Sequence, residues 1–327
     1  MEPASVLVYV GLDAVGDGLM KLAFVRALRA AFPAARITWV AGKGHSVYAG
    51  TLAPLVVGLL DEVIDQAGFG GRAAELWRAR PLPDRRFDLI LDTQRRLLTS
   101  LILRRVRHGR FISAAAGFRL SAARPAAGWR RPASLVGQLL DLASLASGRP
   151  LGGLAPAPLA IDAAADAAAA ALLPAGPAYV GLAPGAGGRH KCWPLDRFIA
   201  LGAAQAERGR VPVFLLGPGE AGWAEAVAAA LPTALLPLQR VATVTPLLTI
   251  ALGRRLAAAV ANDSGTGHML AAADRPLLSL FGPTPAAKFA PATPRGRVIR
   301  AQDFGAETMD AIPLAAVETA LAGMMAL

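Results

Sequence analysis

Residues 6–10 read Val6-Leu-Val-Tyr-Val10, an uninterrupted apolar run that predicts a strand buried on both faces of a sheet. Residues 11–18 form a loop that contains three glycines, and residues 19–31 carry apolar side chains at helical spacing. A second strand is predicted at Arg36-Ile-Thr-Trp-Val40. Strand, loop, helix and strand form a βαβ unit, and such a unit requires a parallel sheet.

The same alternation continues along the chain. Apolar runs and helical spacing predict strands at 62–64, 87–91, 179–183, 211–216, 256–261 and 277–281, and helices at 97–106, 162–173, 195–208, 221–231, 245–252, 268–273 and 314–325. Proline and glycine become dense at 148–158, which indicates a linker. We therefore expect an α/β protein of two Rossmann-like domains, 1–155 and 156–327, a division that suits a chain of 327 residues.

Composition excludes several classes of protein. With 54% hydrophobic and 17% charged residues, the chain is too apolar to be disordered. No apolar run reaches the roughly 20 residues that a membrane span needs. The single cysteine, Cys192, excludes an internal disulfide and a cysteine-built zinc site. No basic segment precedes an apolar one at the start, so we expect no secretory signal and a cytoplasmic protein.

Positive charge is concentrated in the first half. The net charge is +11, and residues 1–155 carry 21 Lys and Arg against 11 Asp and Glu. Between Arg95 and Arg131 there are ten arginines and no acidic residue. Such a field attracts phosphate, anionic lipid or nucleic acid, and the scarcity of aromatic residues there favours a phosphorylated lipid or sugar over nucleic acid. The alternative is a solvated basic face.

The first loop that could carry chemistry is 11–18. Ligands of parallel α/β sheets bind at the carboxyl ends of the strands, where this loop lies. It holds two carboxylates, Asp13 and Asp17, but not the Gly-x-Gly-x-x-Gly spacing of a dinucleotide site. Asp17 could cap the following helix. In the functional interpretation it is a general base that takes a proton from an acceptor hydroxyl.

The second loop reads Pro184-Gly-Ala-Gly-Gly-Arg-His-Lys-Cys-Trp-Pro194 and again follows a predicted strand. Its glycines allow backbone N–H groups to approach a ligand closely. Arg189, His190 and Lys191 add positive charge, which suits a diphosphate that gains charge as it leaves. The alternative is an ordinary glycine-rich turn with solvated basic side chains.

The third loop, Asn262-Asp-Ser-Gly-Thr-Gly-His268, ends a strand and starts a helix. Free N–H groups and the helix dipole make such a place an anion site, and Asp263 could accept ribose hydroxyls. The second and third loops lie in the same expected domain as two more turns, at 217–220 and 280–285. Together these four segments predict a nucleotide pocket at one edge of that domain's sheet. The four histidines lie too far apart to predict a metal site, and Ser264 lacks the Gly-x-Ser-x-Gly elbow of a hydrolase.

Five segments form an ordered set that spans nearly the whole chain. They are Val15-Gly-Asp17, Arg26-Ala-Leu-Arg-Ala-Ala-Phe-Pro33, Phe87-Asp-Leu-Ile-Leu-Asp-Thr-Gln94, Lys191-Cys-Trp-Pro-Leu-Asp-Arg-Phe198, and Asn262–His268 together with Phe281-Gly-Pro-Thr284. As a set they resemble glycosyltransferase family 9, the lipopolysaccharide heptosyltransferases.

The resemblance implies a GT-B fold, in which two Rossmann-like domains turn parallel sheets toward each other across a cleft. It implies an inverting, metal-independent glycosyltransferase with two catalytic residues, Asp17 as general base and Lys191 beside the donor phosphates. The expected donor site comprises Gly185, Ala186, Arg189, Gly217, Asp263, Ser264, Gly265, Thr266, Gly267, His268 and Gly282. The expected acceptor site comprises Asp13, Gly16, Gln94, Arg95 and Arg119.

The resemblance also implies the substrates and partners. The donor would be a nucleotide-sugar, ADP-heptose, bound as substrate and without a cofactor. The acceptor would be a phosphorylated glycolipid of the lipopolysaccharide core. The enzyme would then work as a peripheral protein on the anionic inner face of the inner membrane, and no nucleic-acid partner is expected.

Some residues depart from the family pattern. Gly18 stands where an aliphatic residue is usual, Pro285 replaces the aspartate expected after Gly-Pro-Thr, and Gln239-Arg240 replaces a glycine-rich turn. These departures leave another nucleotide-sugar donor open. Two other classes remain as alternatives: a catalytically silent sugar-nucleotide-binding protein, and a basic nucleic-acid-associated protein that would show steeply salt-dependent affinity.

Overall fold

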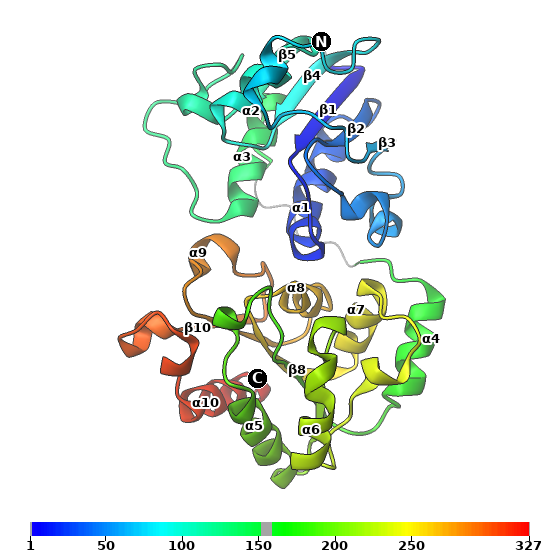
Figure 1. Ribbon diagram of the computed structural model, residues 1–327, viewed down its shortest axis with the longest axis vertical. Helices are drawn as coiled ribbons and strands as arrows, with labels where there is room; N and C mark the ends of the chain where they lie inside the picture. The colour runs from blue at the N-terminus through cyan, green and yellow to red at the C-terminus, as the bar shows by residue number, and fades with distance from the viewer. Residues whose placement is uncertain (1, 152–158, 327) are drawn as a thin grey trace. The chain divides into compact units, whose positions relative to one another are not determined.

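The first predicted strand, β1 (Ser5–Val10), lies at the centre of a five-stranded parallel sheet. The computed structural model describes residues 2–151 and 159–326. The chain divides into two compact units, Met1–Ala157 and Pro158–Leu327 (Figure 1). The domain boundary expected at 155/156, and most of the linker expected at 148–158, lie outside the described residues.

The first unit has strand order β3-β2-β1-β4-β5, with every neighbouring pair parallel. Its other strands are β2 (Arg36–Ala41), β3 (Glu62–Ile64), β4 (Arg86–Asp92) and β5 (Arg107–Ser113), and its helices are α1 (Val15–Ala31), α2 (Leu97–Leu103) and α3 (Leu135–Ser147). Short 3-10 turns are η1 (Val47–Ala49), η2 (Ala53–Val56), η3 (Ala73–Leu76) and η4 (Ala115–Phe118).

Both faces of the first sheet are covered. Helices α1 and α3 pack against each other, and α3 also contacts β4 and β5. A core cluster joins Leu7, Tyr9 and Ile90 of the strands to Ile102 and Leu103 of α2. The strands are therefore buried on both sides, as their uninterrupted apolar sequences predict.

The second unit has strand order β10-β9-β8-β6-β7, again entirely parallel. Its strands are β6 (Tyr179–Ala183), β7 (Val211–Phe214), β8 (Leu256–Asn262), β9 (Leu277–Phe281) and β10 (Gly296–Arg300). Its helices are α4 (Ala163–Leu172), α5 (Leu195–Glu207), α6 (Ala224–Ala230), α7 (Pro246–Arg254), α8 (Gly265–Ala272), α9 (Ala286–Phe289) and α10 (Leu314–Met325). Its 3-10 turns are η5 (Arg189–Lys191), η6 (Pro218–Trp223), η7 (Pro237–Arg240), η8 (Ala301–Phe304) and η9 (Met309–Ala311).

Alternate residues of β6 enter different cores. Val180 and Leu182 join the cluster that holds the apolar side chains of α5, α6 and α10. Tyr179 and Ala183 join the cluster that holds those of α4, α7 and α8. This is the two-residue period of a strand with helices on both faces.

The α/β architecture of two parallel sheets confirms the fold expected from the sequence, with some differences in detail. Helix α1 begins at Val15, so Gly16, Asp17 and Gly18 lie in its first turn and not in a loop. A Cβ on Gly18 would lie 2.6 Å from Val47 Cγ2, so the missing side chain lets η1 pack on the helix. Helix α8 begins at Gly265, three residues before the expected start.

Candidate functional site

In each of the two sheets, the predicted loops lie next to the point where the strand order reverses. In an open parallel sheet, ligands bind beyond the carboxyl ends of the strands where the strand order reverses. The order reverses between β1 and β4 in the first unit, and between β6 and β8 in the second. The predicted loops 11–18 and 184–194, and the turn that starts at Asp263, all follow strands that flank these points.

In the second unit, an ion pair joins the loops after β6 and β8. Lys191 Nζ lies 3.0 Å from Asp263 Oδ2, with the Lys191 side chain 31% exposed and that of Asp263 11% exposed. The ammonium group is thus held in place by one partner and still accessible to solvent. A group held in this way can turn toward an incoming anion with little loss of conformational entropy.

Asn262 fixes the geometry of these loops. Its Oδ1 accepts a hydrogen bond from the Trp193 backbone N–H at 3.1 Å, and its Nδ2 donates to the Pro184 carbonyl at 2.7 Å. The amide is buried and therefore clamps both ends of the loop after β6 to the end of β8. Sequence reasoning did not single out Asn262 as a site residue.

Helix α8 starts two residues after Asp263 of this pair. Ser264 is its N-cap, and its hydroxyl accepts from the Gly267 N–H at 3.1 Å. The first N–H groups of a helix have no partner within the helix, so those of Gly265 and Thr266 can meet an anion. His268, one turn into α8, is 8% exposed. The structure therefore brings together all six residues predicted here, Asp263 to His268.

The loop after β7 adds a carboxylate. A Cβ on Gly185 would lie 2.5 Å from Glu220 Oε1, so Gly185 allows the carboxylate to approach the backbone. Glu220 Oε2 accepts from the Gly217 N–H at 3.1 Å. Gly185 and Gly217, both predicted, are thus joined by Glu220, which was not predicted. A carboxylate at the end of the second strand of such a sheet can bind ribose hydroxyls.

Three further predicted donor residues have different surroundings. Ala186 lies beside Gly185 and is half-buried. The Arg189 guanidinium stacks over the Trp223 ring, 4.5 Å from its centroid. The Gly282 carbonyl accepts from Gln302 Nε2 at 2.7 Å, so this residue ties the turn after β9 to η8. Only Arg189 among the three carries a charge that could meet a phosphate.

In the first unit, Asp17 is the third residue of α1. Its Oδ2 accepts from the Ala14 N–H at 3.3 Å, and the side chain is half-buried. Ala14 is the N-cap, so the position expected for a capping Asp17 is wrong by three residues, although the carboxylate does help to cap the helix. Asp17 Oδ1 makes no hydrogen bond among the described residues, which leaves one oxygen for a substrate.

Asp13 does not have the surroundings of an acceptor-binding residue. Its side chain is fully buried, with Lys21 Nζ 2.5 Å from Oδ1. The Ser46 hydroxyl and the Trp39 indole donate to Oδ2 at 2.5 and 3.3 Å. Because both oxygens are already bonded, the carboxylate holds the loop after β1 in place and has no surface for a substrate. The prediction that Asp13 contacts the acceptor is therefore wrong. Gly16, which was also predicted to contact the acceptor, is buried in α1.

The loop after β4 lies beside the loop after β1. Gln94 Oε1 lies 3.3 Å from the position that a Cβ on Gly11 would occupy. Arg95 is mostly exposed. The pKa of its guanidinium is lowered by the small part that is buried and by the nearby positive charge of Arg131. Arg119 is exposed just after η4, in the segment that follows β5. These three predicted residues therefore all follow carboxyl ends of neighbouring strands.

Asp92, at the end of β4, is a buried carboxylate that the sequence analysis did not assign to the site. Burial raises its pKa to about 6, against the opposing effect of hydrogen bonds from Ser100, Ser113 and the Gln94 backbone N–H. These bonds measure 2.5, 2.8 and 2.8 Å. Asp92 thus fixes the start of the segment that carries Gln94 and Arg95. Its position in the strand was visible in the sequence, but its partners depend on the strand order.

The sequence matches glycosyltransferase family 9 (heptosyltransferase) over residues 76–311, most of the chain. The chain belongs to glycosyltransferase family 9. It is therefore a glycosyltransferase, and the family supports binding of a nucleotide-sugar. No curated protein matches the sequence.

Solved structures share the fold. The glycosyltransferase family 9 protein of Veillonella parvula DSM 2008 has a TM-score of 0.74 at 18% identity, covering 99% of this chain and 97% of its own. The ADP-heptose LPS heptosyltransferase II of E. coli has a TM-score of 0.68 at 20% identity, covering 98% of each chain. The E. coli heptosyltransferase WaaC, solved with ADP, has a TM-score of 0.68 at 18% identity, covering 98% and 99%.

Within the described ranges, no helix is long and apolar enough to cross a bilayer. In the same part of the chain, no three His, Cys, Asp or Glu side chains gather as ligands for a metal ion.

Proposed function

We propose that this family 9 enzyme transfers heptose from ADP-heptose to a phosphorylated glycolipid acceptor of the lipopolysaccharide-core type, with inversion and without a metal. The observation that carries the proposal is the Lys191–Asp263 pair beside the start of α8, at the point where the second sheet reverses its strand order. The ADP and ADP-heptose named for the E. coli structures support the choice of donor.

The donor half of the mechanism rests on positive charge. The diphosphate gains negative charge as its bond to the anomeric carbon breaks. Lys191 and the N–H groups of Gly265 and Thr266 are the donors placed to stabilise that charge, and Arg189 can leave Trp223 to join them. Glu220 and Asp263 are the carboxylates available to the ribose hydroxyls.

The acceptor half rests on Asp17. Its carboxylate takes the proton of an acceptor hydroxyl, and the oxygen forms a bond to the anomeric carbon on the face opposite the leaving diphosphate. Gln94, Arg95 and Arg119 supply polar and basic groups for a phosphorylated acceptor. Contact with an anionic membrane and a cytoplasmic location stay predictions of the sequence.

Nucleotide binding tests the proposal first. We expect ADP and ADP-heptose to raise the thermal unfolding temperature more than UDP, GDP or CDP at equal concentration. A ligand at 100 times its Kd adds about 2.7 kcal/mol to the free energy of unfolding, which a thermal shift detects. Selective stabilisation by UDP or GDP would replace ADP-heptose with another nucleotide-sugar. A transfer assay with the stabilising donor then identifies the anomeric configuration of the product.

A further inference from the structure

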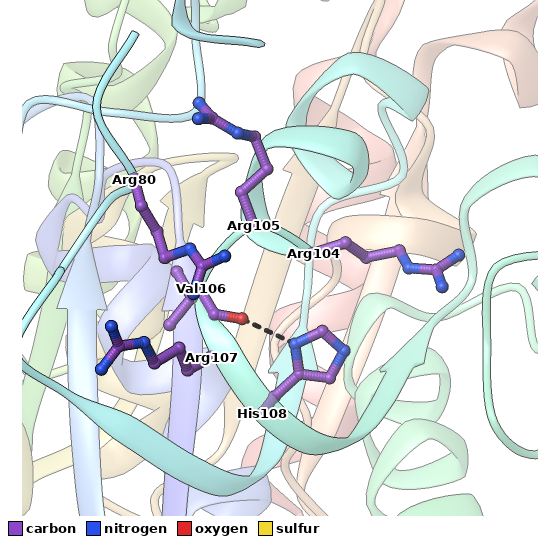
Figure 2. A pocket seen from close by; sticks show the side chains of 6 residues that line it. All are labelled: Arg80, Arg104, Arg105, Val106, Arg107 and His108. Atoms are coloured by element: carbon purple, nitrogen blue, oxygen red, sulfur yellow. Dashed lines mark hydrogen bonds between the residues drawn. The ribbon is translucent and has the colours of Figure 1, made fainter. Parts of the chain in front are cut away.

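A pocket with a basic lining lies at the opposite end of the first sheet from Asp17. A pocket of about 420 Å³ is lined by Arg80, Arg104, Arg105, Val106, Arg107 and His108 (Figure 2). Strand β5 begins at Arg107 and ends at Ser113, at the carboxyl edge. Seven residues at about 3.3 Å each put roughly 20 Å between the pocket and that edge. The pocket is therefore separate from the proposed acceptor site.

Hydrogen bonds to the backbone build the walls of the pocket. The Arg105 guanidinium donates to the Glu75 carbonyl, and to the Arg78 carbonyl at 2.6 Å. These bonds hold the segment after η3 against the end of α2, which brings Arg80 to the pocket. The His108 ring is fixed in turn by its Nδ1, which donates to the Val106 carbonyl at 2.7 Å.

Three guanidinium groups of the pocket have no counter-ion among the described residues. Arg80, Arg104 and Arg107 are exposed, and in residues 2–151 and 159–326 no hydrogen bond or ion pair joins their side chains to another residue. Figure 2 shows Arg80 reaching over Val106, with Arg107 on one side and Arg104 on the other. In the same unit, Arg29 and Arg85 each pair with a carboxylate. In the part of the chain that the structure describes, no acidic side chain lines the pocket.

This arrangement suits one class of ligand. Like charges around a hollow repel each other, and a bound anion removes that repulsion. A guanidinium offers a planar pair of N–H donors that matches the spacing of phosphate oxygens, so arginine is the side chain that phosphate groups most often meet in bidentate contacts. The pocket is wide enough for a phosphate group together with part of the molecule to which the phosphate is attached.

We propose that the pocket formed by Arg80, Arg104, Arg107 and His108 binds a phosphate group, either of a membrane lipid or of a free phosphorylated molecule. This is a site additional to those for donor and acceptor, and it does not depend on which sugar is transferred. Trp77 helps to distinguish the two sources, because it lies between the two carbonyls that Arg105 holds and is 81% exposed. Tryptophan prefers the interface of a bilayer, so a lipid source would change its surroundings.

The test uses the full chain and two matched double variants. Arg104→Gln/Arg107→Gln removes two charges from the pocket, and Arg124→Gln/Arg130→Gln removes two charges elsewhere in the same unit. Calorimetry measures binding of inorganic pyrophosphate, and sedimentation measures binding to vesicles of phosphatidylglycerol or of phosphatidylcholine alone. Lys191→Ala identifies any pyrophosphate bound at the donor loops. An unchanged thermal unfolding temperature shows that each variant is folded.

We expect the pocket variant to bind its phosphate ligand about tenfold more weakly than the wild type and the control variant, because two charge-assisted contacts are lost. Loss of pyrophosphate binding supports a free phosphate. Loss of phosphatidylglycerol binding, with a blue shift of tryptophan emission that disappears in Trp77→Phe, supports a lipid. The proposal is overturned if the two double variants bind both pyrophosphate and phosphatidylglycerol vesicles equally well. Pyrophosphate binding that is lost in Lys191→Ala alone is assigned to the donor loops, and the vesicle measurement then decides.

Discussion

Two carboxylates four residues apart have opposite tasks. Asp13 has both oxygens bonded and no exposed surface, whereas Asp17 has one oxygen without a hydrogen bond among the described residues. The difference follows from their positions, since Asp13 precedes α1 and points into the protein and Asp17 lies in its first turn. Of the two, Asp17 can accept a proton from a substrate.

The role of Asp17 predicts a selective loss of turnover. In Asp17→Asn, the amide oxygen can still accept from the Ala14 N–H, so the helix start is retained. We expect kcat to fall roughly 10²- to 10⁴-fold, the range for loss of a general base, with ADP affinity unchanged. Steady-state transfer kinetics and calorimetry with ADP measure the two quantities. A loss of ADP affinity in this variant would show that Asp17 maintains the fold.

The role of Lys191 predicts a loss of ADP binding. In Lys191→Ala we expect ADP to bind about tenfold more weakly or worse, because one charge-assisted contact to the diphosphate is lost. The matched control is Lys288→Ala, which removes a charge that packs on Phe289. Calorimetry on both variants makes the measurement. Equal ADP affinities in both variants would remove Lys191 from the donor site.

Asp92 predicts a pH dependence of stability. Burial raises its pKa from 3.8 to about 6, so the folded chain keeps a proton at pH values where the unfolded chain has released it. The contribution of Asp92 to the free energy of unfolding is therefore complete below about pH 4 and is lost as the pH rises through 6, a change on the order of 3 kcal/mol.

Urea unfolding of the wild type and of Asp92→Asn at several pH values between 4 and 7 measures this change. We expect the wild type to lose stability relative to the variant across that range. Asp84→Asn, at an exposed position, is the control. Stability curves that run parallel for the wild type and Asp92→Asn would contradict the assignment.

At the scale of elements, one buried ion pair joins three segments. Asp13 connects the loop after β1 to Lys21 of α1 and to Ser46 of the loop after β2. Asp13→Ala would leave the Lys21 ammonium buried without its carboxylate, and we expect a loss of about 3–5 kcal/mol in the free energy of unfolding. Chemical denaturation measures it. The double variant Asp13→Ala/Lys21→Met should recover part of the loss. If its effect equals the sum of the effects of Asp13→Ala and Lys21→Met, the two side chains are not coupled.

Strong apolar patterns made most elements predictable. Strand β1 is a continuous apolar run after Ser5, β6 is apolar throughout, and β9 is interrupted only by Ser279. Helix α10 was predicted with its observed limits. Strand β5 was missed because its first four residues, Arg107-His-Gly-Arg110, are mostly polar and exposed or half-buried, and its apolar part is short. Strand β10 was missed for a similar reason, since only Ile299 is buried on this edge strand.

The site was predictable where its residues form one continuous sequence motif. The segment from Asp263 to His268 was found because small polar residues between a strand and a helix indicate an anion site. Glu220, Asn262 and Asp92 were missed as site residues because each contacts segments that are distant in sequence. Glu220 approaches Gly185, Asn262 bonds to both ends of the loop after β6, and Asp92 bonds to α2 and β5. These segments become neighbours only when the strand order is known.

At the scale of the molecule, each unit has its own sheet and its own core. We expect residues 159–327, expressed alone, to fold cooperatively and to bind ADP with an affinity close to that of the full chain, because a domain of this size can bury a sufficient core. Circular dichroism during thermal unfolding and calorimetry with ADP measure this. An unfolded fragment would show that the second unit depends on the first.

The two sheets also carry information about ancestry. Counted within the first unit, the strand order is 3-2-1-4-5. In the second unit, Leu235 makes an isolated parallel bridge to Val213 of β7 and so extends the sheet beyond β7 by one residue. With Leu235 counted as the third strand, β7, β6, β8 and β9 complete the same order, 3-2-1-4-5, and β10 follows as a sixth strand. Tandem copying of one ancestral α/β half would leave this shared order in both units, with the third strand of the second copy reduced to a single residue.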